Sequence, residues 1–422
     1  MFLVAPSQVI IFMGVSPSLQ VLDLSNNSLS GSIPQCLFNL SFGQVLNLKR
    51  NNLSGIISNT FSEGCRLQTL NLNQNRLEGK VPKSLANCKS LEVLDIGNNR
   101  IKDTFPCHLK NIDQLHVLVL RSNKFSGHID CPGSNNRRWP TLQIFDIAAN
   151  SFRGKLPLTS LGTWEAMQPN PYKDQSEFFL IQFPMPFGFA HDYRDAITVH
   201  IKNLELQLEK ILTMYTSIDV SCNNFEGPIP QVIGKFKALY AINFSHNAFT
   251  GPIPSFIGDL RELESIDLSS NGLHGEIPWQ LANLNFLSVL NVSNNKLAGP
   301  IPTGTQIQSF PESSFENNAG LCGPPLKTKC GSSPAKKDNG PLDTGSESII
   351  NWKHISVEIG FIFGFGIVIV PLIYWKRWRT WYFERIDRCL ARLVPCLFLE
   401  TRKHGRRVNR NQRRRGSGNN RN

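Results

Sequence analysis

The chain has 422 residues, and its 44 Lys and Arg exceed its 32 Asp and Glu to give a formal net charge of +12. A hydrophobic share of 41% with only 18% charged residues excludes a disordered polyelectrolyte and provides enough apolar side chains for a core. The excess charge lies after residue 375, where 15 bases accompany 3 acids, so the first 375 residues are neutral as a whole. This distribution indicates a neutral body with a basic tail and argues against a nucleic-acid partner.

Residues 1–18 form an N-terminal segment. Its apolar stretch from Phe2 to Val15 lacks a basic start and contains Pro6 and Gln8, so it does not match a secretory signal peptide. How the following residues would reach an extracytoplasmic compartment stays open.

A repeat of the form L-x-L-x-x-N-x-L-x-G-x-I-P fills residues 19–157, with six copies, and 214–304, with four. Most copies are 24 residues apart, a period typical of leucine-rich repeats. The repeated asparagines are Asn27, Asn51, Asn75, Asn99, Asn123, Asn150, Asn223, Asn247, Asn271 and Asn295. The pattern predicts an α/β solenoid, in which each L-x-L is a short strand of one parallel sheet and its leucines enter the core.

The other repeated residues have structural roles in this interpretation. We expect the asparagine to be buried after the strand, where its side chain bonds backbone groups of adjacent coils. The glycine permits a turn with positive φ, and Ile-Pro starts an extended or helical segment on the convex side.

Residues 158–213 interrupt the repeats. They contain Trp164 and a run of aromatics at Phe178, Phe179, Phe183, Phe187 and Phe189, which favours a folded island over a flexible linker. Within this insertion, Ala196 to Leu208 alternates as a strand or hairpin does.

A capping segment, residues 305–331, follows the last repeat. Cys322 and Cys330, beside Gly-Pro-Pro, are expected to form a disulfide, and Cys65–Cys88 on adjacent coils is a second candidate pair. The cysteine spacings match no zinc pattern, so no metal site is predicted. Residues 332–356, rich in Gly, Ser and Pro, read as a juxtamembrane stalk.

Residues 357–375 are expected to form a single transmembrane helix, because Ile359 to Trp375 carries no charge and Lys376, Arg377 and Arg379 follow at once. The positive-inside rule then places the basic tail, residues 376–422, in the cytoplasm. Gly360, Gly364 and Gly366 offer a face for close packing of a partner helix. Acceptor sequons for N-glycosylation all precede this span, at Asn26, Asn39, Asn52, Asn243 and Asn291.

These features resemble the plant leucine-rich-repeat receptor-like proteins. The resemblance rests on the L-x-x-N-x-L-x-G-x-I-P consensus, the island with Trp164-Glu-Ala-Met167, the cap Gly320-Leu-Cys322-Gly-Pro-Pro-Leu326, and one span with a short basic tail. It implies a horseshoe with a parallel concave sheet, in a single-pass type I plasma-membrane protein with its N-terminus outside. It also implies an extracellular peptide, protein or glycan ligand. Receptor kinases would act as adaptors and co-receptors, engaged through the island, the last repeats and the transmembrane helix.

The family normally has a signal peptide, a cysteine-bearing N-terminal cap and more repeats before the island. The sequence is therefore expected to be an N-terminally truncated member.

Basic residues after the strands of repeats two to six are the candidate ligand-binding residues. Stacked coils could align them into a stripe for an acidic peptide or a uronate-like sugar, although a solvated surface is the simpler reading. The residues are Lys49, Arg50, Arg76, Arg100, Lys102, Arg121, Lys124 and Arg153.

No catalytic arrangement or phosphate-binding glycine loop is found, and the tail is too short for a kinase domain, so neither an enzyme nor a cofactor is predicted. The expected function is that of a cell-surface receptor that recruits receptor kinases, in plant defence as the resemblance implies. The alternatives are a wall-facing inhibitor resembling polygalacturonase-inhibiting proteins, or a non-functional receptor fragment.

Overall fold

The computed structural model describes residues 20–38, 44–129, 131, 139–157, 164–168, 215–304 and 306–331, with the backbone of 197–201 and 204–208. All of these lie in the first of two compact units, Met1–Pro334, whereas the second unit, Ala335–Asn422, lies outside the described residues. The segment 1–18, the sequon at Asn39, the stalk, the span with its glycines and the tail therefore have no structural description. In the described part, no helix has both the length and the apolar character needed to cross a membrane.

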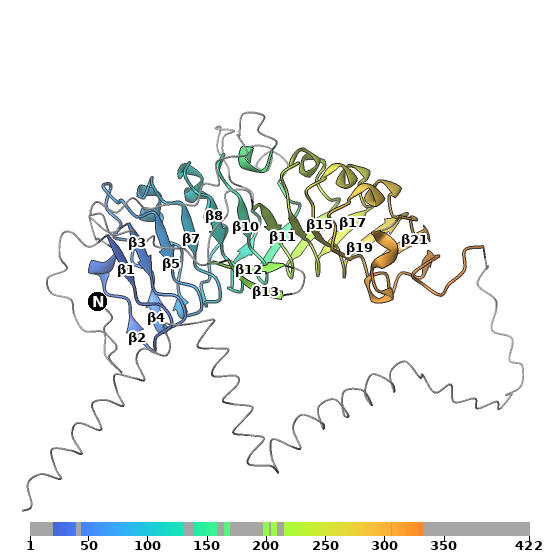
Figure 1. Ribbon diagram of the computed structural model, residues 1–422. Coiled ribbons are helices and arrows are strands. Elements are labelled where there is room, and N and C mark those ends of the chain that lie inside the picture. Colours follow the sequence, from blue (N-terminus) through green and yellow to red (C-terminus); the bar gives the residue numbers. More distant parts are fainter. Residues whose placement is uncertain are drawn as a thin grey trace, which may run out of the picture. The chain divides into compact units, whose positions relative to one another are not determined.

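A ten-stranded parallel sheet is the main element of the first unit (Figure 1). Each coil of the solenoid contributes one three-residue strand, and we number the coils 1 to 10 by their repeated asparagine, from Asn27 to Asn295. The strands of this main sheet are β1 (Val21–Asp23), β3 (Val45–Asn47), β5 (Thr69–Asn71), β7 (Val93–Asp95), β8 (Val117–Val119), β10 (Ile144–Asp146), β14 (Ser217–Asp219), β16 (Ala241–Asn243), β18 (Ser265–Asp267) and β20 (Val289–Asn291). Parallel in-register pairing confirms the predicted parallel sheet of L-x-L strands.

A second series, here called the side strands, follows the repeated asparagine in most coils and forms two further parallel sheets. The first contains β2 (Ser30–Ser32), β4 (Asn52–Ile56) and β6 (Arg76–Glu78), and the second contains β9 (Ser126–Gly127), β11 (Ser151–Gly154), β15 (Asn224–Gly227), β17 (Ala248–Gly251), β19 (Gly272–Gly275), β21 (Lys296–Pro300) and β22 (Gly320–Cys322). Gly79 illustrates the expected turn, because its φ of 81° is one that side-chain-bearing residues rarely adopt.

Short 3-10 helices close the coils on the side opposite the main sheet. They are η1 (Gln35–Leu37), η2 (Lys83–Asn87), η3 (Cys107–Asn111), η4 (Glu165–Met167), η5 (Gln231–Lys235), η6 (Ser255–Asp259), η7 (Trp279–Asn283), η8 (Ile307–Ser309) and η9 (Glu312–Ser314). A proline directly precedes most of them, as Pro82 precedes η2, which confirms the predicted role of Ile-Pro. Proline suits this position because its φ is preset and its missing N–H is not needed there.

The repeated asparagine bonds the backbone of two coils, as predicted. Asn75 donates from Nδ2 to the carbonyl of Leu48 in the preceding coil at 2.9 Å and to that of Leu72 in its own coil at 3.1 Å. Its Oδ1 accepts the N–H of Leu53 at 3.0 Å. Since unpaired buried backbone groups are costly, this one side chain holds adjacent coils at a fixed spacing.

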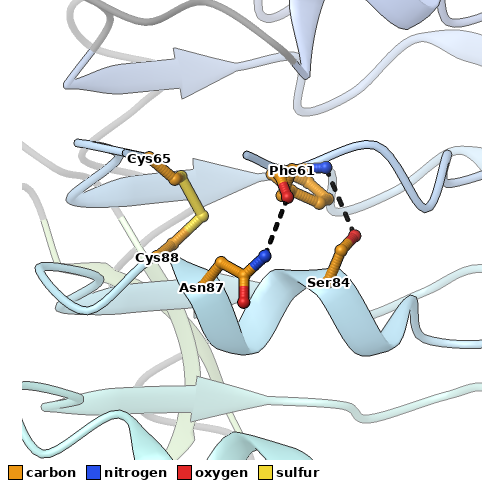
Figure 2. The surroundings of a disulfide bond; sticks show 5 residues. All are labelled: Phe61, Cys65, Ser84, Asn87 and Cys88. Atoms are coloured by element: carbon orange, nitrogen blue, oxygen red, sulfur yellow. Dashed lines mark hydrogen bonds between the residues drawn. A yellow bond between two sulfur atoms is a disulfide. The ribbon is translucent and has the colours of Figure 1, made fainter. Parts of the chain in front are cut away.

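Disulfides stabilise the coils and the cap. The predicted bonds are both present: Cys65–Cys88 joins neighbouring coils, and Cys322–Cys330 lies within the cap. Figure 2 shows the first of them, beside hydrogen bonds from Asn87 Nδ2 to the Phe61 carbonyl and from the Phe61 N–H to Ser84 Oγ. A third disulfide, Cys107–Cys131, links coils 4 and 5 and was not expected from the sequence.

The solenoid continues across the insertion without a break in register. Strand β10 of coil 6 pairs with β14 of coil 7, so that Asp146 lies opposite Asp219. Asn223 donates to the carbonyl of Ile147 at 3.1 Å and accepts the N–H of Phe152 at 3.0 Å, bonds that bridge 76 and 71 residues of sequence. The insertion therefore leaves the array between two coils that stack as ordinary neighbours.

The Trp164–Met167 segment, expected within the island, instead completes coil 6 of the solenoid. Trp164 is 1% exposed and stacks on Phe236 of coil 7 with ring centroids 6.0 Å apart, while the Met167 carbonyl accepts the N–H of Ala238. Trp164 precedes η4 where a proline precedes η2 and η5, and Met167 takes the buried position that Leu85 and Ile233 have in those helices. Farther along the insertion, β12 (Ile197–Ile201) and β13 (Leu204–Leu208) form an antiparallel pair, so that of the two predicted forms, a strand or a hairpin, the structure has the hairpin.

Candidate ligand-binding faces

Two rows of side chains run along the outward side of the main sheet, which we call the main-sheet face. The central row is the last residue of each strand: Asp23, Asn47, Asn71, Asp95, Val119, Asp146, Asp219, Asn243, Asp267 and Asn291. The flanking row lies two residues further on: Ser25, Lys49, Asn73, Gly97, Arg121, Ala148, Ser221, Ser245, Ser269 and Ser293. Five aspartates against two cations make this face acidic.

A buried charge cluster occupies the middle of the main-sheet face, at coils 4 to 7. Nη1 of Arg121 lies 2.6 Å from Oδ2 of Asp146 and 3.6 Å from Oδ2 of Asp219, and all three side chains are less than a tenth exposed. Asp95, fully buried in the neighbouring coil, accepts Nδ2 of Asn73 at 2.8 Å. Arg121 thus faces two carboxylates, while Asp95 is influenced by the charges of both Lys49 and Arg121, so that three acids accompany two cations here.

Burial raises the pKa of all three carboxyl groups, because a low-dielectric environment disfavours their charged form. The pKa of Asp219 rises to about 6, through burial and the charge of Asp146, while Arg121 opposes the rise. Burial disfavours the charged form of Arg121 too, but the Asp146 and Asp219 carboxylates outweigh it and raise the pKa of the guanidinium.

The eight predicted basic residues do not form one stripe. Lys49 and Arg121 are buried in the flanking row of the main-sheet face, at 3% and 8% exposure. Arg50 lies at the turn with a φ of 55°, and its Nε donates to Oε1 of Gln74 at 2.7 Å. The other predicted residues are exposed on the side strands or beside them.

Exposed cations of consecutive coils stand directly after the repeated asparagine, and we call them the basic row: Arg76, Arg100 and Lys124. The Arg100 N–H bonds the Leu77 carbonyl and the Lys124 N–H bonds the Ile101 carbonyl, so the coils that carry them are adjacent. Lys102 and Arg153, also exposed, sit two positions further along their coils. The structure therefore separates a basic side-strand surface from an acidic main-sheet face.

Two grooves lie beside the side strands. The larger, about 1,240 Å³, runs over coils 5 to 9 and is lined mainly by proline, isoleucine and the ring of Phe256. The smaller, about 430 Å³, includes Lys80, Lys83 and His108, whose pKa is lowered by burial. No group of three or more metal-ligating side chains comes together within the described ranges.

The described sequons differ in exposure. Asn26 is exposed, Asn52 lies half-buried on β4, and Asn243 and Asn291 lie half-buried in the central row of the main-sheet face. Oδ1 of Asn243 accepts both the N–H and the hydroxyl of Ser245, at 3.1 and 2.7 Å. Asn243 is the strand partner of Asp219, so a glycan there would lie beside the charge cluster.

The sequence signal that we missed was the pairing of opposite charges one repeat apart. Arg121 and Asp146 lie 25 residues apart, which brings them to neighbouring coils of a 24-residue array. Asp219 joins them only because the insertion lies outside the stack, and this could not be read from spacing alone.

Comparison with known proteins defines the fold. The leucine-rich-repeat family models match residues 44–101, 65–125, 18–40 and 262–284. Among solved structures, the plant peptide hormone receptor RGFR1 in complex with RGF2 aligns with a TM-score of 0.53 and 27% identity, over 72% of this chain and 44% of that one. A plant ice-binding protein aligns with a TM-score of 0.54 at 23% identity, over 74% and 84% of the two chains, which shows the shared fold alone. The fold is therefore that of a plant leucine-rich-repeat solenoid.

The chain is also similar in sequence to plant receptor-like proteins. Receptor-like protein 41 of Arabidopsis thaliana is 49% identical over 253 residues, which are 59% of this chain and 29% of that protein. Receptor like protein 23 of the same plant is 56% identical over 206 residues, 49% of this chain and 23% of its own length. Together with the leucine-rich-repeat matches, these similarities support a plant leucine-rich-repeat receptor-like protein. The chain spans about three tenths of the length of the curated relatives that it matches.

Proposed function

We propose that the chain acts as a single-pass cell-surface receptor whose repeats bind an extracellular ligand and which signals by recruiting receptor kinases, in plant defence. The observation that carries the proposal is the unbroken main sheet, which presents polar and charged side chains over ten successive coils. Such an extended surface suits recognition of a long ligand. The relatives are named receptor-like proteins, and one solved neighbour is a peptide hormone receptor with its ligand.

The proposed membrane topology can be tested directly. In plant cells that express the full chain with a C-terminal tag, we expect endoglycosidase treatment to lower the apparent mass and external protease to spare the tag. Replacing Asn26, Asn52, Asn243 and Asn291 with Gln is expected to reduce the mass change. A type I orientation would be contradicted if endoglycosidase left the apparent mass unchanged and external protease did not cleave the repeats.

Kinase recruitment is proposed to involve the transmembrane helix, the island and the last repeats. The variant Gly360→Leu with Gly364→Leu fills the small-residue face that would admit a partner helix. We expect it to weaken co-purification of a receptor kinase several-fold, whereas the matched control Ile367→Leu keeps it. Equal recovery of the kinase with both variants would refute a packing role for these glycines.

The basic row is proposed to contact an acidic ligand, either an acidic peptide or a uronate-like sugar. Its exposed cations lie on adjacent coils, a regular arrangement that suits a regular polyanion. This observation also favours the second candidate function, a wall-facing inhibitor module that binds without signalling. The kinase experiment separates the two, because an inhibitor module needs no kinase partner.

A further inference from the structure

In coils 7 to 9, the two rows of the main-sheet face contain aspartates but no lysine or arginine of their own. In these coils the central row reads Asp219, Asn243 and Asp267, and the flanking row has a serine in each coil. The residue just before each strand is Thr216, Tyr240 and Glu264 in turn. The one strong cation near Asp219 is Arg121 of coil 5, and it makes its short contact with Asp146 instead.

Asp219 is left partly unsatisfied by this arrangement. Its Oδ1 accepts the Ser221 N–H at 3.0 Å and the Ser221 hydroxyl at 2.6 Å. Its Oδ2 is buried and has no hydrogen-bond partner among the described residues, and Nη1 of Arg121 at 3.6 Å is beyond a normal hydrogen-bond distance. A buried carboxylate oxygen without a donor is costly to the free protein, so a donor brought by a ligand would be favoured.

Two tyrosines stand just before the strands of coils 7 and 8. Tyr215 occupies the position at which the next coils have Leu239 and Leu263, and its ring centroid lies 5.9 Å from that of Tyr240. The Tyr215 hydroxyl is buried and has the Ser217 side chain as its neighbour. Burial raises the pKa of Tyr215, a hydrogen bond with Ser217 opposes the rise, and the charges of Glu264 and Asp219 add to it. Carboxylates next to aromatic rings favour a cation over an anion.

We propose that the main-sheet face of coils 7 to 9 binds a cationic side chain of a peptide or protein ligand, an arginine or a lysine, between Asp219 and the Tyr215–Tyr240 pair. This inference rests on the proposed receptor function and names the chemistry of one ligand contact. Its ligand group has the opposite charge to that expected at the basic row. A bound metal ion is disfavoured, since no three metal-ligating side chains of the described residues gather there.

The test uses the full chain, purified in detergent after endoglycosidase trimming so that no large glycan covers Asn243. The probe is a capped peptide of three arginines, and binding is measured by calorimetry at pH 7 and low salt. The comparison probes are a capped peptide of three glutamates and calcium chloride. We expect saturable binding of the arginine peptide, whereas the glutamate peptide binds only while Arg76, Arg100 and Lys124 of the basic row are intact. No saturable binding of the arginine peptide, or calcium binding that displaces it, would overturn the proposal.

Variants locate the site. Asp219→Asn removes the charge with little change of shape and is expected to weaken arginine-peptide binding at least tenfold, and Asp267→Asn, half-exposed on coil 9, about threefold. The matched control is Glu226→Gln, which alters an exposed acid on side strand β15 and is expected to change the affinity for the arginine peptide less than twofold. Equal losses in all three variants would show diffuse attraction and refute a defined site. If the peptide-binding test fails while the chain keeps its type I topology and still co-purifies with a kinase, only the cation site is refuted and the receptor proposal stands.

Discussion

The main-sheet face and the side-strand surface belong to the same coils but treat charge in opposite ways. On the main-sheet face, Asp95, Arg121, Asp146 and Asp219 are buried and coupled to one another. A few residues further along the same repeats, Arg76, Arg100 and Lys124 are exposed to solvent. The difference teaches that position within the repeat, and not the count of charges, decides whether a charge supports the fold or remains available to a partner.

Removal of the Arg121 guanidinium from the main-sheet face is expected to have the largest effect on stability. Arg121→Met leaves two buried carboxylates without their countercharge and is expected to lower the free energy of unfolding by roughly 3–5 kcal/mol. The matched control, Arg76→Met, removes an exposed cation and is expected to cost less than about 0.5 kcal/mol. Chemical denaturation of the full chain measures both. Similar losses in the two variants would contradict the contrast between the faces.

The pH dependence of stability should report Asp219. Because its folded pKa of about 6 exceeds the ordinary aspartate value, the folded state binds more protons than the unfolded state between roughly pH 4 and pH 6. The contribution of this group to stability is therefore present at low pH and is lost as pH rises through 6. We expect Asp219→Asn to recover about 1–3 kcal/mol at pH 7, with little gain near pH 4. A gain that is equal at both pH values would contradict the assigned titration.

Reversing the basic row is expected to affect stability least. Arg76→Glu, Arg100→Glu and Lys124→Glu together should shift unfolding by less than about 1 kcal/mol, because exposed charges contribute little to stability. Binding of polygalacturonate at low salt should nevertheless fall at least tenfold, since three charges change sign along one surface. Triple reversal of Lys235, Lys237 and Lys296 is the control for unspecific attraction. Unchanged polygalacturonate binding in the first variant would sink the proposed contact.

Most of the solenoid was predictable because its pattern is local and repeated. The asparagine ladder, the positive-φ glycines, the proline-led 3-10 helices and the Cys65–Cys88 disulfide follow from one 24-residue unit, and Cys322–Cys330 follows from the cap. Cys107 and Cys131 are 24 residues apart, so the same one-repeat spacing also allows this disulfide, which the sequence analysis did not include. Trp164 was assigned to the island because its position in sequence after coil 6 does not show that its ring enters the core.

The sequence by itself determined the repeat, the parallel sheet, the cap and the neutral body with its basic tail, since each depends on residues close together in the chain. Tertiary structure alone decided which charges face one another. The stacking of coil 7 on coil 6, across the whole insertion, brings Asp219 beside Asp146 and Arg121 and removes all three from water. Burial then governs their charge state, and burial is a property of the stacked coils rather than of any single repeat.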